Sequence, residues 1–284
     1  MVPYNSPKQL AVFLAQHGLS LKKRFGQNFL VNADVRGRIL SLLSPARGTR
    51  VWEIGPGLGC MSAAILETGA LLNVFEIDRG FIKILVEEFS ARENFRLIEG
   101  DVLKTWPPLR DEKPGLIFGN LPYNSAAALI ADFLEKDFIQ SRWVFMVQKE
   151  VAARMAAKPG TKNYSSFSLL CQTFMTVQLL FEVSPAAFYP RPEVFSCVAG
   201  LQPRPDQPVI LCRGIFFGIL RALFASRRKT LKNNLLPWAA SLGKDADWVT
   251  RLLDNAGLRP EIRGETLSAA DAVSLANQAA RLIR

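Results

Sequence analysis

The segment Val51-Trp52-Glu53-Ile54-Gly55-Pro56-Gly57-Leu58-Gly59 decides the fold predicted for this chain of 284 residues. Its first four residues form a short run typical of a buried strand. The three glycines allow a tight turn and a close approach of the main chain to a ligand that side chains would exclude. A helix-length segment follows, so the stretch indicates a strand, a ligand-binding loop and a helix of an α/β protein.

Further apolar runs continue this rhythm on the carboxyl side, at residues 71–75, 95–98, 116–118 and 143–147. Runs that are apolar on both faces and joined by helix-length segments predict a parallel sheet covered on each side. Two more runs, at residues 174–183 and 194–201, are expected to close the sheet as an antiparallel pair. Ligands of such a sheet bind at the carboxyl ends of its strands.

The last part of the chain has a different pattern. Residues 203–208 hold three prolines, which deny hydrogen bonds to helix and sheet alike and indicate a linker. Helices are predicted at residues 215–226, 229–236, 246–256 and 268–283. We therefore predict an N-terminal extension (1–21), an α/β domain (22–203) and a helical domain (204–284).

Composition excludes several classes of protein. With 49% hydrophobic and 21% charged residues, the chain is typical of globular proteins and not of disordered ones. No apolar run is long enough to span a membrane, and no secretory signal is recognised, so a cytoplasmic protein is expected. The chain has four cysteines far apart in the sequence (Cys60, Cys171, Cys197 and Cys212) and a single histidine (His17), so no metal site is predicted. The thiols are expected to be buried in a protein of a reducing compartment.

Charge is distributed unevenly along the chain, whose formal net charge is +10. Residues 1–50 carry +7, residues 51–200 carry −3 and residues 201–284 carry +6. An acidic middle between basic ends favours a catalytic body with surfaces that hold a polyanion, of which nucleic acid is the first candidate. A basic surface that serves only solubility is the alternative.

Acidic residues follow the second and third predicted strands, where they would meet the glycine loop. Glu76 is placed to accept hydrogen bonds from ribose hydroxyls. Asp101 can accept from an adenine amino group while the amide of Val102 donates to the ring. The sixth position of a dinucleotide-binding fingerprint holds Cys60, which weakens an NAD interpretation. The pattern predicts a site for S-adenosylmethionine, with ordinary loop glycines and surface acids as the alternative.

The fourth predicted strand runs into Asn120-Leu121-Pro122-Tyr123. An adenine amine is a poor nucleophile because its lone pair is delocalised into the ring. If the Asn120 side-chain oxygen and the Leu121 carbonyl accept its hydrogens, the nitrogen becomes tetrahedral and its lone pair can attack a methyl group. Pro122 stiffens the turn, and Tyr123 offers a stacking face for a flipped or unpaired base. Phe188 is a candidate for the opposite face, with packing in the core as an equal alternative.

With these residues in view, the chain resembles the ribosomal RNA adenine N6-dimethyltransferases that modify two adjacent adenosines near the 3′ end of small-subunit (16S) RNA. The resemblance rests on residues 23–30, 53–59, 76–78, 100–101 and 120–123. It implies a Rossmann-like methyltransferase fold with a seven-stranded, mostly parallel sheet and a small C-terminal α-helical domain. It also implies use of S-adenosylmethionine and a role in small-subunit biogenesis. The cofactor-binding residues that it implies, with those already named, are Gln27, Asn28, Leu30, Gly55, Gly57, Glu76, Ile77, Asp101, Val102 and Asn120.

Two further signatures strengthen the resemblance. Residues 188–196 match the family motif F-x-P-x-P-x-V-x-S, which implies a place for Phe188 near the target base, although Glu193 and Phe195 depart from the usual Lys and Asp. Residues 224–235 match the second signature, and clustered cations there suit phosphates. The predicted RNA-binding residues are Lys22, Lys23, Arg24, Arg227, Arg228, Lys229 and Lys232, with a solvated helix end as the alternative.

Three other functions fit parts of this pattern. A large-subunit adenine methyltransferase that confers macrolide-type resistance would share the catalytic centre, but residues 227–231 favour the small subunit. A non-catalytic assembly or transcription factor would not need the residues retained at the predicted site. A DNA amino-methyltransferase would share the logic of Asn120 to Tyr123. We expect a monomer that acts on the small ribosomal subunit.

Overall fold

A seven-stranded sheet forms the centre of the α/β part in the computed structural model, which describes residues 2–19, 27–122 and 125–283. Its strand order is β4-β3-β2-β5-β6-β9-β7. Four neighbouring pairs from β4 to β6 are parallel, and β9 is antiparallel to β6. The predicted fold class is confirmed. The strands are β2 (Arg50–Ile54), β3 (Leu71–Glu76), β4 (Phe95–Glu99), β5 (Leu116–Asn120), β6 (Arg142–Gln148), β7 (Met175–Val183) and β9 (Ser196–Pro203).

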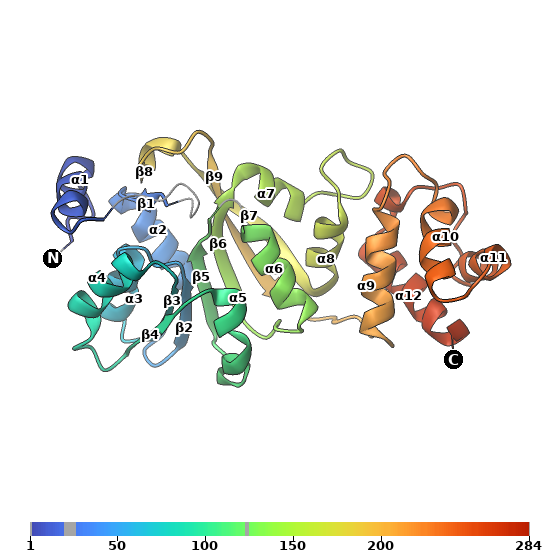
Figure 1. Cartoon of the computed structure of the whole chain (residues 1–284), viewed down its shortest axis with the longest axis horizontal. Coiled ribbons are helices and arrows are strands. Elements are labelled where there is room, and N and C mark those ends of the chain that lie inside the picture. The colour runs from blue at the N-terminus through green and yellow to red at the C-terminus, as the bar shows by residue number, and fades with distance from the viewer. Residues whose placement is uncertain (1, 20–26, 123–124, 284) are drawn as a thin grey trace. The chain divides into compact units, whose positions relative to one another are not determined.

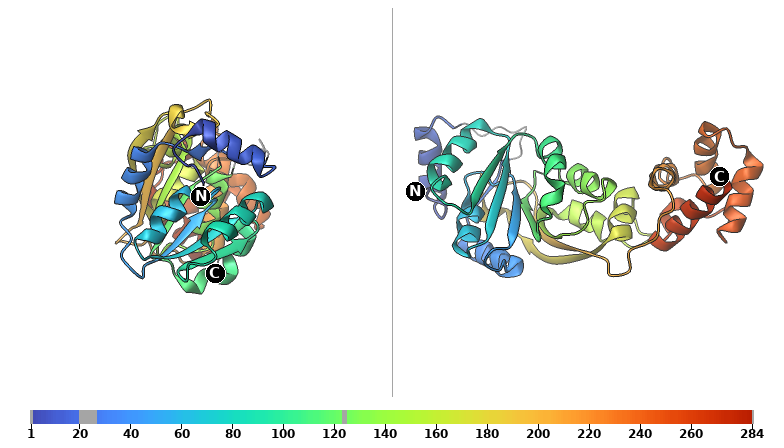
Figure 2. Two further views of the ribbon diagram at one scale, coloured as in Figure 1. Left: turned by 90° about the vertical axis from the view of Figure 1, so that its left-hand side faces the viewer. Right: turned by 90° about the horizontal axis from the view of Figure 1, so that it is seen from below.

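Helices cover both faces of the sheet (Figures 1 and 2). Strands β2, β3 and β5 are buried along nearly their whole length, as their continuous apolar runs require. Their side chains form one core with Ile39, Ile65 and Leu85 from three of the helices. The helices of this part of the chain are α2 (Ala33–Leu43), α3 (Cys60–Glu67), α4 (Arg79–Phe89), α5 (Val102–Thr105), η2 (Pro107–Glu112), α6 (Ala126–Glu135) and α7 (Lys149–Met155), and the three core residues lie on α2, α3 and α4.

Short polar side chains fix where several of these helices begin. Asn32 caps α2 by accepting from the Val35 amide at 2.9 Å. Asp78 caps α4 by accepting from the Gly80 amide at 2.9 Å. Each cap satisfies one of the amides that a first helical turn leaves without a partner. The loops that lead into α2 and α4 therefore end at defined positions.

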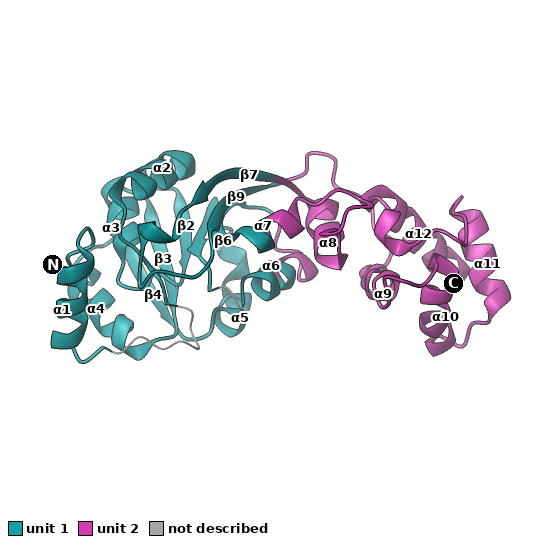
Figure 3. Ribbon diagram, turned by 90° about the horizontal axis from the view of Figure 1, so that it is seen from above, with its two compact units in different colours: residues 1–132, 140–152, 178–202 teal, residues 133–139, 153–177, 203–284 magenta. Residues whose placement is uncertain are grey.

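Two features near the N-terminus were not predicted from the sequence. Helix α1 (Pro7–Gln16) packs beside α4 (Figure 3), because Leu10 and Leu14 share a buried cluster with Phe81 and Ile84. A two-stranded antiparallel sheet joins β1 (Phe29–Leu30) to β8 (Phe188–Tyr189), which follows η3 (Pro185–Ala187). Residues 2–19 are thus a packed part of the α/β body.

The chain divides into two compact units, coloured in Figure 3. Unit 1 comprises residues 1–132, 140–152 and 178–202, and unit 2 comprises residues 133–139, 153–177 and 203–284. Unit 2 therefore includes segments that the sequence prediction places in the α/β domain, because α8 packs against α9 and α12 and the Tyr164 hydroxyl donates to the Leu267 carbonyl at 2.8 Å. Its elements are α8 (Ser166–Phe174), α9 (Arg213–Leu223), α10 (Leu231–Ser241), α11 (Ala246–Asn255), η4 (Gly264–Thr266) and α12 (Ala269–Ile283).

Two helix ends in unit 2 differ from the sequence prediction. Helix α9 ends at Leu223 and not at residue 226, because the buried Asn234 side chain donates to the carbonyls of Leu223 and Ser226. Helix α10 continues past Pro237, where its buried face carries on from Leu235 to Ala239.

The described helices and cysteines were also the subject of expectations from the sequence. None of the described helices is both long and apolar enough to cross a membrane. Cys171 and Cys197 are buried as expected, but Cys212 is exposed because it stands just ahead of the first turn of α9.

Candidate active site

A cavity of about 320 Å³ in unit 1 lies at the carboxyl ends of β2, β3 and β5, and we call it the strand-end cavity. Parallel strands bring their carboxyl ends to one edge of a sheet, so residues far apart in the sequence meet there. All ten residues predicted to bind the cofactor line it: Gln27, Asn28, Leu30, Gly55, Gly57, Glu76, Ile77, Asp101, Val102 and Asn120. Their position agrees with the prediction, and their contacts with a cofactor stay a prediction.

The glycine loop after β2 needs glycine for its backbone shape. Gly55, Gly57 and Gly59 have φ angles of 66°, 60° and 85°, in the left-handed region that side chains disfavour. A Cβ atom at Gly59 would also lie 2.5 Å from the ring of Phe89. At Gly55 a Cβ atom would meet open space, so the main chain itself borders the cavity.

Glu76 ends β3 in a cradle of main-chain amides. Its Oε1 accepts from the amides of Ile77 and Asp78, both at 2.8 Å, and its Oε2 accepts from the Gly57 amide at 3.2 Å. Burial raises the pKa of this carboxyl group, and the three amides oppose that shift. Four lone-pair sites on a carboxylate exceed these three bonds, so Glu76 keeps capacity to accept from a ligand hydroxyl.

Asp101 and Val102 occupy the turn between β4 and α5. Asp101 caps α5 by accepting from the Leu103 amide at 3.0 Å through Oδ1, and it is half-buried at the cavity wall. Val102 is the first helical residue, whose amide has no acceptor within the helix. An acceptor and a donor thus stand side by side, as recognition of an adenine edge requires.

Asn120, Leu121 and Pro122 line the cavity at the end of β5. The Asn120 Nδ2 atom donates to the main-chain carbonyl of Asn28 at 3.0 Å. The amide of Leu121 donates to the Met146 carbonyl on β6 at 3.0 Å, which fixes the turn to the sheet. Tyr123, the fourth residue of this predicted catalytic segment, lies outside the described residues.

Glu53 is the main functional candidate that the sequence prediction did not assign. It lines the cavity, is 2% exposed and accepts from the Ser62 hydroxyl at 2.6 Å. Burial, together with the nearby charge of Glu76, raises the pKa of Glu53 to about 7, while the Ser62 bond opposes the shift. An acid within an otherwise apolar strand is the signal that could have identified it.

Apolar side chains complete the wall and carry no such signal in the sequence. They belong to strands and helices whose burial the fold already requires, so periodicity cannot separate them from the core. The aromatic ones are Phe29, Phe75, Phe81 and Phe118.

Phe188 does not line the strand-end cavity. It is 4% exposed and packs in the core of unit 1 with Leu30, its partner in the β1–β8 pairing, and with Ile39. The alternative of core packing, which the sequence left open, describes its position in this structure. A role beside a target base stays a prediction.

The predicted RNA-binding residues fall into three groups. Lys22, Lys23 and Arg24 lie outside the described residues. Arg227 pairs with Glu265 at 2.6 Å and donates to the carbonyl of Lys162 at 2.7 Å, so it supports the structure of unit 2. Lys232 is half-buried and donates to the Thr250 hydroxyl at 3.0 Å.

Arg228 and Lys229 form the third group. Both are exposed in the turn before α10, which begins at the Thr230 cap. Of the four C-terminal residues of the predicted basic cluster, these two present their charges to solvent, while Arg227 and Lys232 bond protein groups. Their roles in RNA binding stay a prediction.

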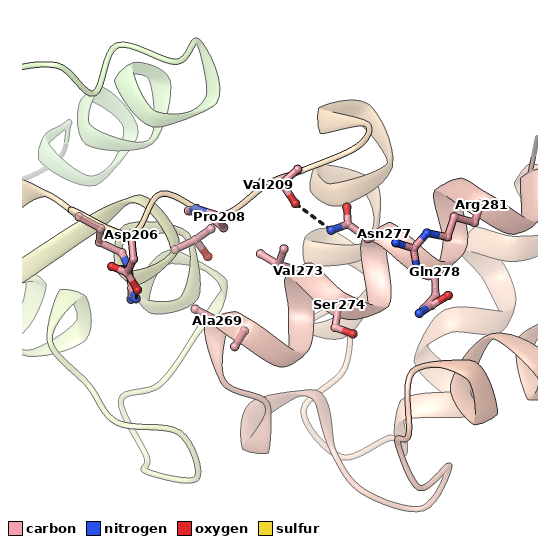
Figure 4. Close-up of a pocket in the computed structure, with 12 residues that line it drawn as sticks. Asp206, Pro208, Val209, Ala269, Val273, Ser274, Asn277, Gln278 and Arg281 are labelled. Carbon is pink, nitrogen blue, oxygen red and sulfur yellow. Dashed lines mark hydrogen bonds and ion pairs between the residues drawn. The ribbon is translucent and has the colours of Figure 1, made fainter.

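A second cavity, of about 460 Å³, lies within unit 2 between α12 and residues 204–209 (Figure 4). Asn277 donates to the Val209 carbonyl at 2.8 Å and accepts from the Leu211 amide at 2.9 Å. Arg204 pairs with Asp206 at 2.6 Å. Asn277 thus fixes the segment after the prolines to α12, and the Arg204–Asp206 pair lies within the proline-rich segment itself.

Residues 18–273 match the family described as ribosomal RNA adenine dimethylase. A protein from Treponema denticola named ribosomal RNA small subunit methyltransferase A is 42% identical over 278 residues, which cover 96% of this chain and 94% of that protein.

Two solved structures share the fold. A dimethyladenosine transferase from Plasmodium falciparum has a TM-score of 0.71 at 24% identity, and the match covers 86% of this chain and 94% of the Plasmodium chain. The 23S rRNA methyltransferase ErmE has a TM-score of 0.65 at 20% identity, and the match covers 88% of this chain and 98% of the ErmE chain. At these identities the two likenesses show the fold alone.

Proposed function

This chain belongs to the ribosomal RNA adenine dimethylase family, and we propose that it methylates the N6 amines of two adjacent adenosines in a hairpin near the 3′ end of small-subunit (16S) ribosomal RNA. The product is N6,N6-dimethyladenosine, and the modification contributes to small-subunit biogenesis in the cytoplasm. The observation that carries this proposal is the position of Asn120, oriented by Asn28 at the wall of the strand-end cavity.

The chain is an S-adenosylmethionine-dependent methyltransferase, and the donor groups of the cavity fit that cofactor. Glu76 keeps acceptor capacity for a ribose hydroxyl beside its three amide bonds, and Asp101 with Val102 offers an acceptor and a donor for adenine. The left-handed glycines let the main chain border the ligand. When bound, this cofactor supplies a methyl group made electrophilic by a positively charged sulfur.

Asn120 and Leu121 prepare the adenine amine for attack. The amine nitrogen lends its lone pair to the ring and is therefore planar and weakly nucleophilic. Acceptors at the Asn120 Oδ1 atom and at the Leu121 carbonyl favour tetrahedral geometry, which returns the lone pair to the nitrogen. Because the Asn120 Nδ2 atom donates to Asn28, Oδ1 is the end of the amide that can accept from the substrate.

No strong base is required by this chemistry, because a methylated amine nitrogen loses its extra proton readily to water. The base must instead reach the cavity unpaired and unstacked. Stacking on an aromatic side chain compensates for the loss of base stacking by about 1–3 kcal/mol. Tyr123, next to Pro122 in the sequence, is the residue to which we assign that role.

Basic segments supply the affinity for ribosomal RNA. Arg228 and Lys229 are exposed at the start of α10, which suits contact with phosphates. We assign the same role to Lys22, Lys23 and Arg24. The curated relative with 42% identity is named for the small subunit, which supports this substrate over the large one.

The test is methyl transfer from labelled S-adenosylmethionine to small ribosomal subunits from cells that lack this modification. Large subunits and duplex DNA serve as controls, and the labelled nucleoside is identified. Label confined to small subunits as N6,N6-dimethyladenosine supports the proposal. Label on large subunits alone, or tight binding of subunits without label, contradicts it.

A further inference from the structure

Residues 2–19 contribute no side chain to the strand-end cavity, yet they pack directly behind its wall. The Ser6 hydroxyl caps α1 by accepting from the Gln9 amide at 3.3 Å. Val2, Leu10 and Leu14 are buried together with Leu58 of the glycine loop. Burial of three apolar side chains shows that this segment is held on unit 1 by a continuous apolar contact.

Tyr4 makes a polar contact with the glycine loop itself. Its hydroxyl donates to the main-chain carbonyl of Leu58 at 3.0 Å, across 54 residues of sequence. Burial raises the pKa of the Tyr4 phenol, so the hydroxyl stays protonated as a donor must. Leu58 stands between Gly57 and Gly59, which have no side chains to brace the loop, so external contacts must fix its position.

Two aromatic residues carry the same packing to the cavity surface. Phe29 and Phe81 line the cavity and meet edge to face, with ring centroids 5.5 Å apart. Both also belong to the apolar cluster that holds α1. A Cβ atom at Gly57 would lie 3.2 Å from the ring of Phe29, so this ring packs tightly against the loop.

A third contact secures the far end of the segment. Leu19 packs onto Gly80, where a Cβ atom would lie 2.4 Å from the Leu19 side chain. Gly80 is fixed in turn by its amide, which donates to Asp78 at 2.9 Å in the turn after Glu76. The segment thus contacts the loop that follows β2 and the first turn of α4, the helix that follows β3.

We propose that residues 2–19 are a positioning element for cofactor binding, with Tyr4 holding the glycine loop at Leu58. The segment raises affinity for the cofactor by keeping the loop and the Phe29–Phe81 pair in their binding geometry before the ligand arrives. It leaves the methyl-transfer step unchanged once the cofactor is bound. This inference rests on the proposed function, because it assumes that the strand-end cavity holds the cofactor.

The test compares Tyr4→Phe with Tyr164→Phe in the full chain. Both variants remove a tyrosine hydroxyl that donates to a leucine carbonyl, but Tyr164 bonds Leu267 in unit 2. Calorimetric titration with S-adenosylhomocysteine is expected to show a dissociation constant raised about threefold to tenfold in Tyr4→Phe, the effect of removing one hydrogen bond. Tyr164→Phe is expected to bind as the wild type does.

Two further readouts separate positioning from general stability. Hydrogen exchange at the Gly59 amide, which donates to Pro56 at 3.0 Å, is expected to accelerate in Tyr4→Phe alone. The Michaelis constant for S-adenosylmethionine is expected to rise without a change in kcat. Equal affinity in Tyr4→Phe and the wild type, or an equal loss in both variants, would overturn the inference. Failure of the wild type to bind S-adenosylhomocysteine would instead contradict the assignment of the cavity itself.

Discussion

The side-chain nitrogen of Asn120 donates to the main-chain carbonyl of Asn28, 92 residues earlier in the chain. A carbonyl can only accept, so this contact determines which end of the Asn120 amide faces Asn28. The oxygen end is consequently directed away from Asn28, at the wall of the strand-end cavity. The segment before β1 therefore orients the residue that ends β5, and the predicted catalytic residue depends on a neighbour from a distant part of the sequence.

Asn120→Ala is expected to lose methyl transfer by about 100-fold or more while it still binds S-adenosylhomocysteine. The reason is that the acceptor acts on the amine as its lone pair forms, so its removal affects the transition state. Single-turnover transfer and calorimetric titration measure the two effects. Ser125→Ala, which removes a hydroxyl from the wall of the same cavity, is the matched control and is expected to stay active. Transfer by Asn120→Ala near the wild-type rate would contradict the lone-pair mechanism.

Glu76→Gln is expected to weaken S-adenosylhomocysteine binding by about tenfold to 100-fold. The amide would turn its NH2 group toward the main-chain amides of Ile77 and Asp78 or of Gly57, which replaces a charged hydrogen bond by a repulsive contact. Titration calorimetry measures the change. Glu99→Gln is the control, because Glu99 is exposed and pairs with Glu76 in the β3–β4 register. Similar losses in both variants would show that Glu76 has no special role.

Strands and cavity residues were predictable because their signals are local. The apolar runs that became β2, β3 and β5 are each contiguous, and the acids and glycines that follow them stand within a few residues. A parallel sheet then brings these strand ends together whatever the intervening sequence. Gly55, Glu76, Asp101 and Asn120 meet at one cavity for this reason.

Other features depend on contacts that sequence patterns do not encode. Phe188 is buried because β8 pairs with β1, and a two-residue pairing leaves no periodic signal. Arg227 stands in a run of cations but bonds Glu265 and two main-chain carbonyls. Tyr4 lies just before α1, and its hydroxyl bonds a loop 54 residues further along the chain. In each case the position of the side chain is fixed by tertiary packing.

Affinity for S-adenosylmethionine is expected to rise between about pH 6 and pH 8 through Glu53. The pKa of this buried carboxyl group is about 7 without ligand. A cationic ligand favours its ionised form, so binding lowers that pKa and releases a proton, and a reaction that releases a proton strengthens as pH rises. Titrations across this range in buffers of different ionisation enthalpy measure both the affinity and the proton release.

Two comparisons make the role of Glu53 specific. S-adenosylhomocysteine lacks the sulfonium charge and is expected to show a weaker pH dependence. Glu53→Gln is expected to remove the difference between the two ligands. Of the other groups coupled to Glu53, burial raises the pKa of Cys60 to about 12 and that of Tyr4 as well, so neither ionises in this range. The wild type and Glu53→Gln both contain Glu76. An unchanged pH profile in Glu53→Gln would therefore show that the proton released on binding comes from Glu76.

Charge reversal at Arg228 and Lys229 is expected to weaken binding of small ribosomal subunits in a salt-dependent manner. Both side chains are exposed before α10, and removing one cation that binds a phosphate lowers the slope of log affinity against log salt by about one. Filter binding of the Arg228→Glu, Lys229→Glu variant at several salt concentrations measures that slope.

Lys83→Glu, on the exposed side of α4, is the control for net charge. Arg227 stays unchanged, because its replacement would break the Glu265 pair within unit 2 and lower stability. Equal salt slopes in the variant and the wild type would remove this turn from the RNA interface.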